Sequence, residues 1–263
     1  MKVYFTIFHA YMKTLLQYRI AAFAGIVTQV FWGILLIIIY KAFYASSPGS
    51  APMSVQDFII YTWLVQATFR LIPFGIDTEI QQMMSKGVIG FELVRPISLL
   101  HLWMARYLAK RLAPTLLRFF PTMIISLLFL GMKLPVSISG CIGWFVSLFL
   151  ALWLSAVISL LMSLSLFWTI SGEGISHMVT VLIYSTSGQI LPLQIFPDHI
   201  ASILRFLPFS GMVDLPNRYY IGTLSLSQLP MTILFQASWI FVLLGVCQVL
   251  YNKGTKKIVI QGG

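Results

Sequence analysis

Acidic and histidine side chains are where acid–base or metal chemistry would begin in this sequence. Inside a membrane such groups are costly and are kept mainly for function, so their placement is informative. Of the four histidines, only His177 lies inside an apolar run, two residues from its start, where an interfacial role is more common than ligation. The seven acids all lie in connections or at the ends of apolar runs: Asp57, Asp77, Glu79, Glu92, Glu173, Asp198 and Asp214. This pattern argues against a catalytic centre or a gradient-coupled site.

Nucleotide-binding and hydrolase motifs are also absent from the sequence. It contains no His-Glu-x-x-His, no Gly-x-Ser-x-Gly and no Gly-x-x-x-x-Gly-Lys-Ser/Thr loop, which are the spacings that zinc, acyl and phosphate chemistry require. Cys141 and Cys247 both lie in apolar runs and do not have metal-ligand spacing. We therefore expect no enzyme activity, no metal site and no cofactor bound by this chain. Any work that it performs needs energy from another protein.

The composition indicates a membrane protein. Of 263 residues, 59% are hydrophobic and 9% are charged, with a mean hydropathy of +0.90, whereas a soluble domain carries roughly 25% charged residues. A net charge of +10 is also found in proteins that bind nucleic acid. The basic residues, however, sit at the ends of apolar runs, which favours orientation on an anionic inner leaflet. No nucleic-acid partner is expected.

Six apolar runs are long enough to cross the membrane, which takes about 20 residues. They cover residues 20–43, 58–76, 112–132, 138–170, 175–195 and 224–250. Arg70 interrupts the second run and Arg118 lies near the start of the third. The apolar neighbours of Arg70 outweigh its insertion cost of about 2.5–3.5 kcal/mol, and its stem can reach the interface. The sequence predicts an all-α membrane protein with six transmembrane helices, one domain over residues 1–263 and no evident break within a span.

Basic residues in the connections predict the orientation. With both termini in the cytoplasm, eleven basic residues lie on the cytoplasmic side and four lie outside. The opposite orientation inverts this ratio and violates the positive-inside rule. We expect a multi-pass protein of the bacterial cytoplasmic membrane.

Residues 1–19 have the pattern of an amphipathic helix. Apolar side chains recur at helical spacing along one side: Phe5, Phe8, Met12 and Leu15. Cations on the other side, such as Lys2 and Lys13, suit anionic lipid headgroups at the inner interface. The helix is either a functional interfacial element or a plain start to the first span, and the pattern does not separate these two readings.

The connection over residues 77–111 is much longer than the four to six residues typical of a passive loop. Thr78 and Gln81 match a capping box for a short amphipathic helix, and Gly87 supplies a left-handed stop. Ser98 can cap a second helix that continues into the third span. So much local order in a connection favours a docking surface for another protein.

Residues 191–222, on the outer side, contain four prolines between apolar segments too short to cross. Short interfacial or re-entrant helices are expected there, because unpaired backbone in hydrocarbon is costly. The pattern leaves open whether these helices gate a pathway or only cap the bundle.

Two motifs give the chain a family resemblance. One is the connection Gly-Phe-Glu-Leu-Val-Arg-Pro-Ile-Ser at residues 90–98, and the other is Leu-Pro-Leu-Gln-Ile-Phe-Pro at residues 191–197. Leu-Pro-Phe at 207–209, Gly222 and the basic tail from Lys253 add to them. With the amphipathic N-terminus, these features span the whole chain. It resembles the permease subunits of ABC transporters of the type-2, or type V exporter, superfamily.

The resemblance implies roles that spacing does not show. A separate ABC ATPase, in two copies, would carry ATP and Mg, and a second permease, identical or related, would complete a dimer in the lipid membrane. The coupling region would include Thr78, Glu79, Met83, Lys86, Phe91, Glu92, Arg95 and Pro96. The outer helices, 196–222, would narrow the exit with Pro192, Phe196, Pro197, Pro208 and Phe209. The short outer loops depart from relatives that recognise cargo with a large extracellular domain.

The resemblance thus implies the permease of an ATP-driven exporter that forms the substrate pathway, without fixing the cargo. A non-transporting membrane scaffold or assembly factor would also need an ordered cytoplasmic connection. A secondary transporter is a third reading, but it would need a gradient-coupling residue that the spans do not contain.

Overall fold

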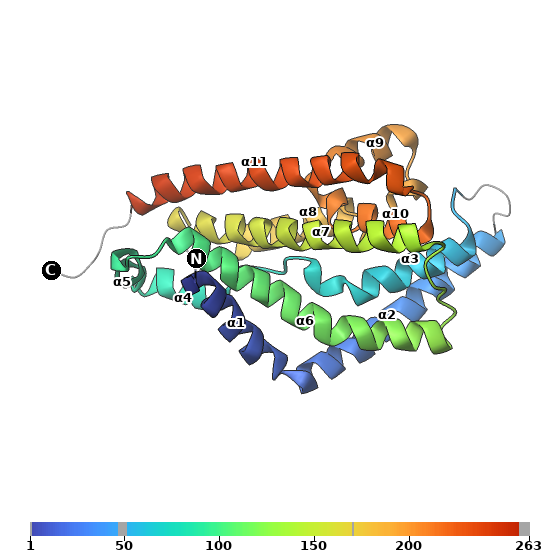
Figure 1. Cartoon of the computed structure of the whole chain (residues 1–263), viewed down its shortest axis with the longest axis horizontal. Helices are drawn as coiled ribbons and strands as arrows, with labels where there is room; N and C mark the ends of the chain where they lie inside the picture. Colours follow the sequence, from blue (N-terminus) through green and yellow to red (C-terminus); the bar gives the residue numbers. More distant parts are fainter. Residues whose placement is uncertain (1, 47–51, 170, 258–263) are drawn as a thin grey trace.

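The computed structural model describes residues 2–46, 52–169 and 171–257, and these residues form helices and connections without any strand (Figure 1). Four helices in this part of the chain are long and apolar enough to cross a membrane: α2 (Arg19–Ser46), α6 (Leu99–Phe129), α7 (Ile138–Leu164) and α11 (Leu229–Thr255). The shorter helices are α1 (Lys2–Leu16), α3 (Val55–Ala67), α4 (Thr78–Ser85), α5 (Ile89–Val94), α8 (Glu173–Thr186), α9 (Asp198–Phe206) and α10 (Asp214–Ile221). The all-helical prediction is confirmed.

Helix α7 is the centre of the bundle, with α11, α10 and α6 packed around it. It is buried over 61% of its most apolar stretch, compared with 22% for α2 and α6 and 17% for α11. Helices α2 and α11, at the periphery of the bundle, instead expose large apolar side chains such as Phe23, Phe31 and Phe241. A chain in water does not present so much apolar surface, whereas a bilayer solvates it.

Small residues let α7 occupy this central position. At Gly143, a Cβ atom would lie 2.4 Å from the ring of Tyr219, so only glycine permits the close approach of α10. Four buried serines follow along α7: Ser147, Ser155, Ser159 and Ser163. Their hydroxyl groups are small enough for tight packing and still offer hydrogen bonds to neighbouring segments.

The second predicted span, 58–76, is not one continuous helix. Helix α3 ends at Ala67, a short 3-10 turn, η1 (Phe69–Leu71), follows, and the chain is then non-helical up to Asp77. Thirteen residues extend only about 20 Å at 1.5 Å per residue, short of the roughly 30 Å of hydrocarbon. The expectation of an unbroken span here was wrong.

Three side chains satisfy the carbonyl groups that this break exposes. Ser155 of α7 donates to the Leu71 carbonyl. Arg111 of α6 donates to Ile72 at 3.1 Å. Thr180 of α8 donates to Pro73 at 3.1 Å. Irregular backbone at membrane depth is tolerated where protein groups pair with it, and here each donor comes from a different helix.

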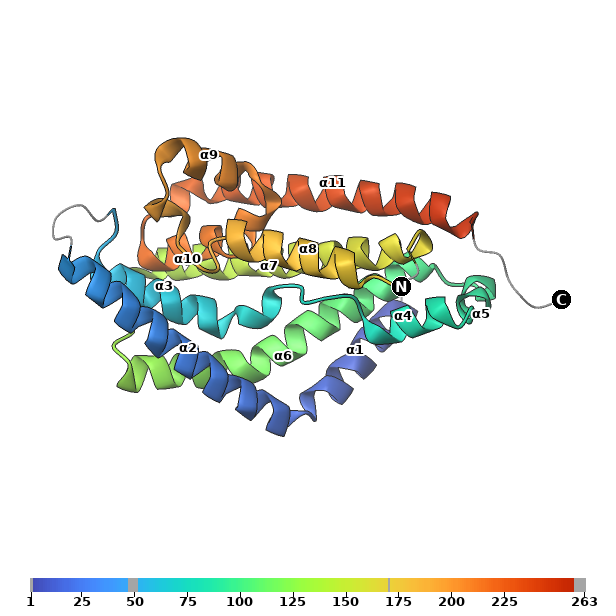
Figure 2. The ribbon, with the colours of Figure 1, turned by 180° about the vertical axis from the view of Figure 1, so that it is seen from behind.

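Helix α8 lies beside this break (Figure 2). It ends at Thr186, so the fifth predicted span, 175–195, is also only partly helical. The turn that follows contains Gly188, whose φ is +92° and whose carbonyl accepts a hydrogen bond of 2.9 Å from the Tyr61 hydroxyl. Tyr184 packs against Phe69 with 6.1 Å between ring centroids. These two contacts therefore hold the end of α8 and the turn after it against α3 and η1.

The other boundaries largely agree with the sequence expectations. Residues 2–16 form the predicted N-terminal helix, which packs along α6 before a sharp bend into α2. Short helices α9 and α10 occupy the predicted outer segment. Helix α6 begins at Leu99, directly after Ser98, and continues into the third span, as the sequence predicts. The short helices α4 and α5 lie at one end of the bundle, and α9 and α10 lie toward the other.

Replacing Ser155 with alanine tests whether the paired break matters for stability. The variant leaves the buried Leu71 carbonyl without its donor, which is expected to cost about 1–3 kcal/mol. The melting temperature of the purified chain in detergent should fall by several degrees. Ser185→Ala is the control, because that exposed hydroxyl bonds only within its own helix. Equal melting temperatures for the two variants would contradict the role assigned to Ser155.

Candidate functional site

Asp77 begins helix α4. Its side chain accepts a hydrogen bond from the Glu79 backbone N–H at 3.0 Å, so Asp77 is the N-cap residue. The predicted capping box, with Thr78 as the cap and Gln81 as its partner, was wrong by one residue. The predicted stop is confirmed, because Gly87 follows the helix with a φ of +69°.

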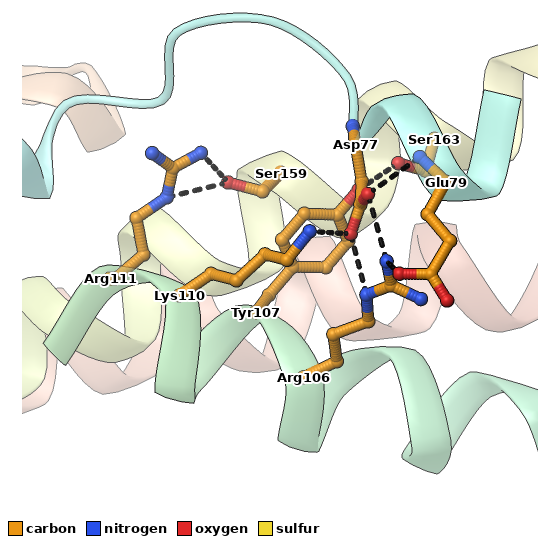
Figure 3. A network of polar contacts seen from close by, with 8 residues as sticks. All are labelled: Asp77, Glu79, Arg106, Tyr107, Lys110, Arg111, Ser159 and Ser163. Atoms are coloured by element: carbon orange, nitrogen blue, oxygen red, sulfur yellow. Dashed lines mark hydrogen bonds and ion pairs between the residues drawn. The ribbon is translucent and has the colours of Figure 1, made fainter. Parts of the chain in front are cut away.

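The Asp77 carboxylate is fully buried between two cations of α6 (Figure 3). Nη2 of Arg106 donates to Oδ1 of Asp77 at 2.9 Å, and Nε of Arg106 lies 2.6 Å from Oδ2. Nζ of Lys110 donates to Oδ2 at 2.5 Å. Arg106 also pairs with the half-exposed carboxylate of Glu79. Two carboxylates thus balance two cations, which offsets the large cost of removing isolated charges from water.

A second set of contacts joins the same stretch of α6 to α7. The Tyr107 hydroxyl is hydrogen-bonded to Ser163 and accepts the Asp77 backbone N–H at 3.4 Å. Nε and Nη2 of Arg111 lie 3.2 and 2.8 Å from the Ser159 hydroxyl. The cluster therefore connects the start of α4, the first half of α6 and the end of α7 (Figure 3).

Two i,i+4 pairs on α6 explain this geometry. Arg106 and Lys110 occupy one helical face, whereas Tyr107 and Arg111 occupy the neighbouring one. The first face contacts α4 and the second contacts α7. Among the described residues, no three His, Cys, Asp or Glu side chains gather to hold a metal ion. The arrangement joins a short helix at the end of the bundle to the long helices α6 and α7.

Helix α1 also contacts this region. The Tyr4 hydroxyl accepts the backbone N–H of Ser98 at 3.0 Å, at the start of α6. The Arg106 guanidinium lies over the ring of Tyr11, 4.9 Å from its centroid, in a cation–π arrangement. The predicted amphipathic helix therefore supports the first half of α6 through specific contacts.

The predicted coupling residues lie on α4, α5 and their connections. Six are exposed: Thr78, Glu79, Lys86, Phe91, Arg95 and Pro96. Glu92 forms an ion pair of 3.3 Å with Arg95. Met83 is half-buried and packs against the core, so it offers little surface to a partner. Phe91 and Val94, in contrast, are 76% and 82% exposed.

The predicted outer-gate residues differ in burial. Pro192 and Pro208 are buried, Phe196 and Phe209 are half-buried, and Pro197 is exposed. Residues 191–222 are tied to the bundle at Asp214, whose N–H donates to the Ser187 carbonyl at 3.1 Å. Its Oδ1 atom accepts the Leu193 N–H at 3.3 Å. Their gating role stays a prediction.

Sequence reasoning did not foresee the buried cluster. Asp77 directly precedes the Thr-x-x-Gln pattern, which predicts Thr78 instead of Asp77 as the cap. Arg106 and Lys110 read as cations at a membrane interface. The available signal was their i,i+4 spacing with an unmatched acid upstream in the same connection.

Comparison with known proteins identifies the architecture. The family model described as ABC-2 family transporter protein matches residues 30–262, nearly the whole chain. No curated protein matches the chain significantly. Members of this membrane family are permease subunits that lack nucleotide-binding motifs and associate with an ATPase component. The chain therefore belongs to the ABC-2 transporter family, as a multi-pass membrane permease component.

Proposed function

We propose that this chain is the permease of an ATP-driven exporter and that its α4–α5 surface docks the ATPase. Two permeases, identical or related, form the substrate pathway with two ATPase copies. Each permease crosses a bacterial cytoplasmic membrane six times and keeps both termini in the cytoplasm. Four crossings are the long helices. The other two are the interrupted α3 and α8 with the segments that continue them.

The observation that carries this proposal is the exposed apolar surface of α5. Phe91 and Val94 are 76% and 82% exposed at the end of the bundle that also carries α4. The proposal places this end on the cytoplasmic side, and exposed aromatic residues are typical centres of protein interfaces. Arg95 and Glu92 supply a charged rim beside them.

The buried cluster gives this surface a route into the membrane. ATP and Mg bound by the ATPase supply the energy. A displacement of α4 acts on α6 through Asp77, because Arg106 and Lys110 hold its carboxylate. Further along α6, Arg111 is bonded both to α7 and to the broken segment after α3. Movement of α4 is thereby transmitted to the helices that border the pathway.

Replacing Phe91 with alanine is expected to weaken ATPase docking by about tenfold or more, as for an interface hot spot. Arg95→Glu should act in the same direction. Its partly exposed ion pair contributes about 0–1 kcal/mol at most, so the variant should fold. The assay co-expresses the tagged chain with each ABC ATPase of the source organism that has no membrane helices, and measures ATPase recovery.

Phe129→Ala is the matched control for this assay. Phe129 is 77% exposed, like Phe91, but lies at the far end of α6. The proposal predicts normal recovery for this control. If no ATPase is recovered with the unmodified chain, the exporter proposal fails. If Phe91→Ala and Phe129→Ala recover the ATPase equally, the docking surface is wrongly placed.

A further inference from the structure

Arg70, Arg111 and Arg118 have no carboxylate partner among the described residues. Arg111 is satisfied by Ser159 and a backbone carbonyl. Arg118 has one long hydrogen bond, from Nη2 to the Ala21 carbonyl at 3.4 Å. The Nε atoms of Arg70 and Arg118 are buried without a hydrogen-bond partner.

Arg118 is half-buried and carries its positive charge without a carboxylate beside it in the described part of the chain. In a low-dielectric environment such an unpaired charge is costly unless an anion offsets it. The Arg118 guanidinium packs against Gly25 of α2. A Cβ atom added to Gly25 would lie 2.2 Å from Cζ of Arg118, so glycine makes the room for the guanidinium.

A cavity of about 480 Å³ adjoins Arg118, between α2, η1, α6 and α8. Gln29 lines it, is 3% exposed and has no hydrogen-bond partner for either amide atom. Gln66 and Gln189 add two more buried amides to the lining. Leaving an amide unpaired in an apolar site costs about 1–3 kcal/mol, so an occupant that bonds to Gln29 is favoured.

The rest of the lining is apolar and aromatic. Trp32 and Leu36 come from α2, Phe69 from η1 and Ile190 from the turn after α8. Trp32 is 51% exposed, so this lining is continuous with the outer surface of α2. Water satisfies amides but does not neutralise the Arg118 guanidinium, which lines the same cavity. The walls instead suit a molecule with an apolar body.

We propose that this cavity binds an amphiphile whose anionic headgroup, a phosphate or carboxylate, is held by Arg118 and Gln29. The inference rests on the proposed function in that it names the substrate class of the exporter. Guanidinium groups bind phosphate and carboxylate in a bidentate manner, and the Gln29 amide adds a donor beside them. The apolar body lies against Trp32 and Leu36.

The test uses the full chain purified in a neutral detergent and titrated with lipid under native mass spectrometry. Phosphatidylglycerol and phosphatidylcholine with identical acyl chains are the probes, since they differ in net charge. The unmodified chain should retain phosphatidylglycerol about tenfold more strongly, which corresponds to about 1.4 kcal/mol. Arg118→Gln and Gln29→Leu should each reduce this preference to about twofold or less.

Lys41→Gln is the matched control. It removes a cation from the same helix, α2, at an exposed position outside the cavity lining, and should leave the preference unchanged. Arg118→Lys keeps the charge and should retain part of the preference. Removing the unpaired charge of Arg118 should not destabilise the fold, and Gln29→Leu provides an independent variant that alters no charge.

Three results would overturn the proposal. Equal retention of the two lipids by the unmodified chain would show that the headgroup charge is not recognised. An unchanged preference in Arg118→Gln and Gln29→Leu would place the lipid elsewhere. Displacement of the lipid by an excess of inorganic phosphate would assign the site to a free anion. Because the assay contains no ATPase, its failure is distinct from failure of the exporter proposal.

Discussion

Replacing Asp77 with alanine is expected to destabilise the chain by about 3–5 kcal/mol and to abolish ATP-driven transport. The change leaves Arg106 almost buried, with only the half-exposed Glu79 as its partner, and removes the carboxylate that Lys110 contacts. Breaking a buried ion pair from one side has this magnitude because an uncompensated charge remains. It also removes the cap of α4, a loss of about 1 kcal/mol in itself.

The measurement is the melting temperature of the purified chain, followed by transport in vesicles that contain the ATPase. Asp198→Ala is the control, since that acid is exposed at the start of α9. Asp77→Asn keeps the shape of the side chain and separates loss of charge from loss of packing. Pairing Asp77→Asn with Arg106→Gln should recover part of the lost stability, because neither ion is then left alone. A melting temperature for Asp77→Ala within about one degree of the control, which is well under 1 kcal/mol, would contradict the account.

Asp214 gives residues 191–222 a pH-dependent stability. Burial raises the pKa of this carboxyl from its usual 3.8 to about 6, against the opposing effect of the Arg218 and Arg205 charges. Arg218 is too distant to compensate fully, with Nη1 3.9 Å from Oδ2. Tyr61 is the other titratable group that faces Asp214. Oδ2 itself has no hydrogen-bond partner.

The sign of the effect follows from proton binding. Between pH 4 and pH 6 (roughly the unfolded and folded pKa values), the folded chain holds a proton on Asp214 that the unfolded chain has released. Stability therefore rises as pH falls through about 6 and is lost as pH rises through it. The full difference corresponds to about 3 kcal/mol, which we treat as an upper bound.

The checking experiment compares melting temperatures at pH 7.5 and pH 4.5 (chosen to bracket a pKa of about 6). The unmodified chain should gain more stability on acidification than Asp214→Asn, which has no proton to take up. Asp198→Asn, altered at an exposed acid, should behave like the unmodified chain. Parallel pH profiles for Asp214→Asn and the unmodified chain would show that Asp214 does not titrate in this range.

The long apolar helices could be predicted because they depend on local composition. A run of about 20 apolar residues signals a span by itself, and α2, α7 and α11 lie close to where the pattern puts them. The left-handed stop at Gly87 is equally local, since its φ of +69° suits glycine without regard to the rest of the fold.

The break after α3 could not be predicted in the same way. Hydropathy stays high through Ile72, so the apolar pattern does not show where the helix ends. Distant side chains stabilise the backbone carbonyl groups that the break exposes. The donors to the carbonyls of residues 71–73 are Ser155, Arg111 and Thr180, far away in sequence. Only the packing of α6, α7 and α8 brings them together. Pro73 and Gly75 do signal a break locally, because proline has no N–H to donate and Gly75 has a φ of +79°, but they do not show which distant groups pair with it.

The candidate sites show the same division. The α4–α5 region was predicted as an ordered surface because its length and cap signals are local. The partner of Asp77 was not, since an acid at a helix start reads equally well as a solvated cap. Arg118 read as a cation near the start of a span, whereas the structure places it against Gly25 in a cavity wall. Only the contacts between helices distinguish a buried partner or cavity residue from a solvated cap or an interfacial cation.

The most direct test of the docking surface is position-specific photo-crosslinking. A benzophenone amino acid replaces Phe91 in the tagged chain, which is co-expressed with the ATPase and irradiated in membranes. The account predicts a covalent adduct between the two proteins at this position and none when the same probe replaces Phe129, which is equally exposed. An adduct at Phe129 with none at Phe91 would contradict the assignment of α4–α5 as the surface on which the ATPase docks.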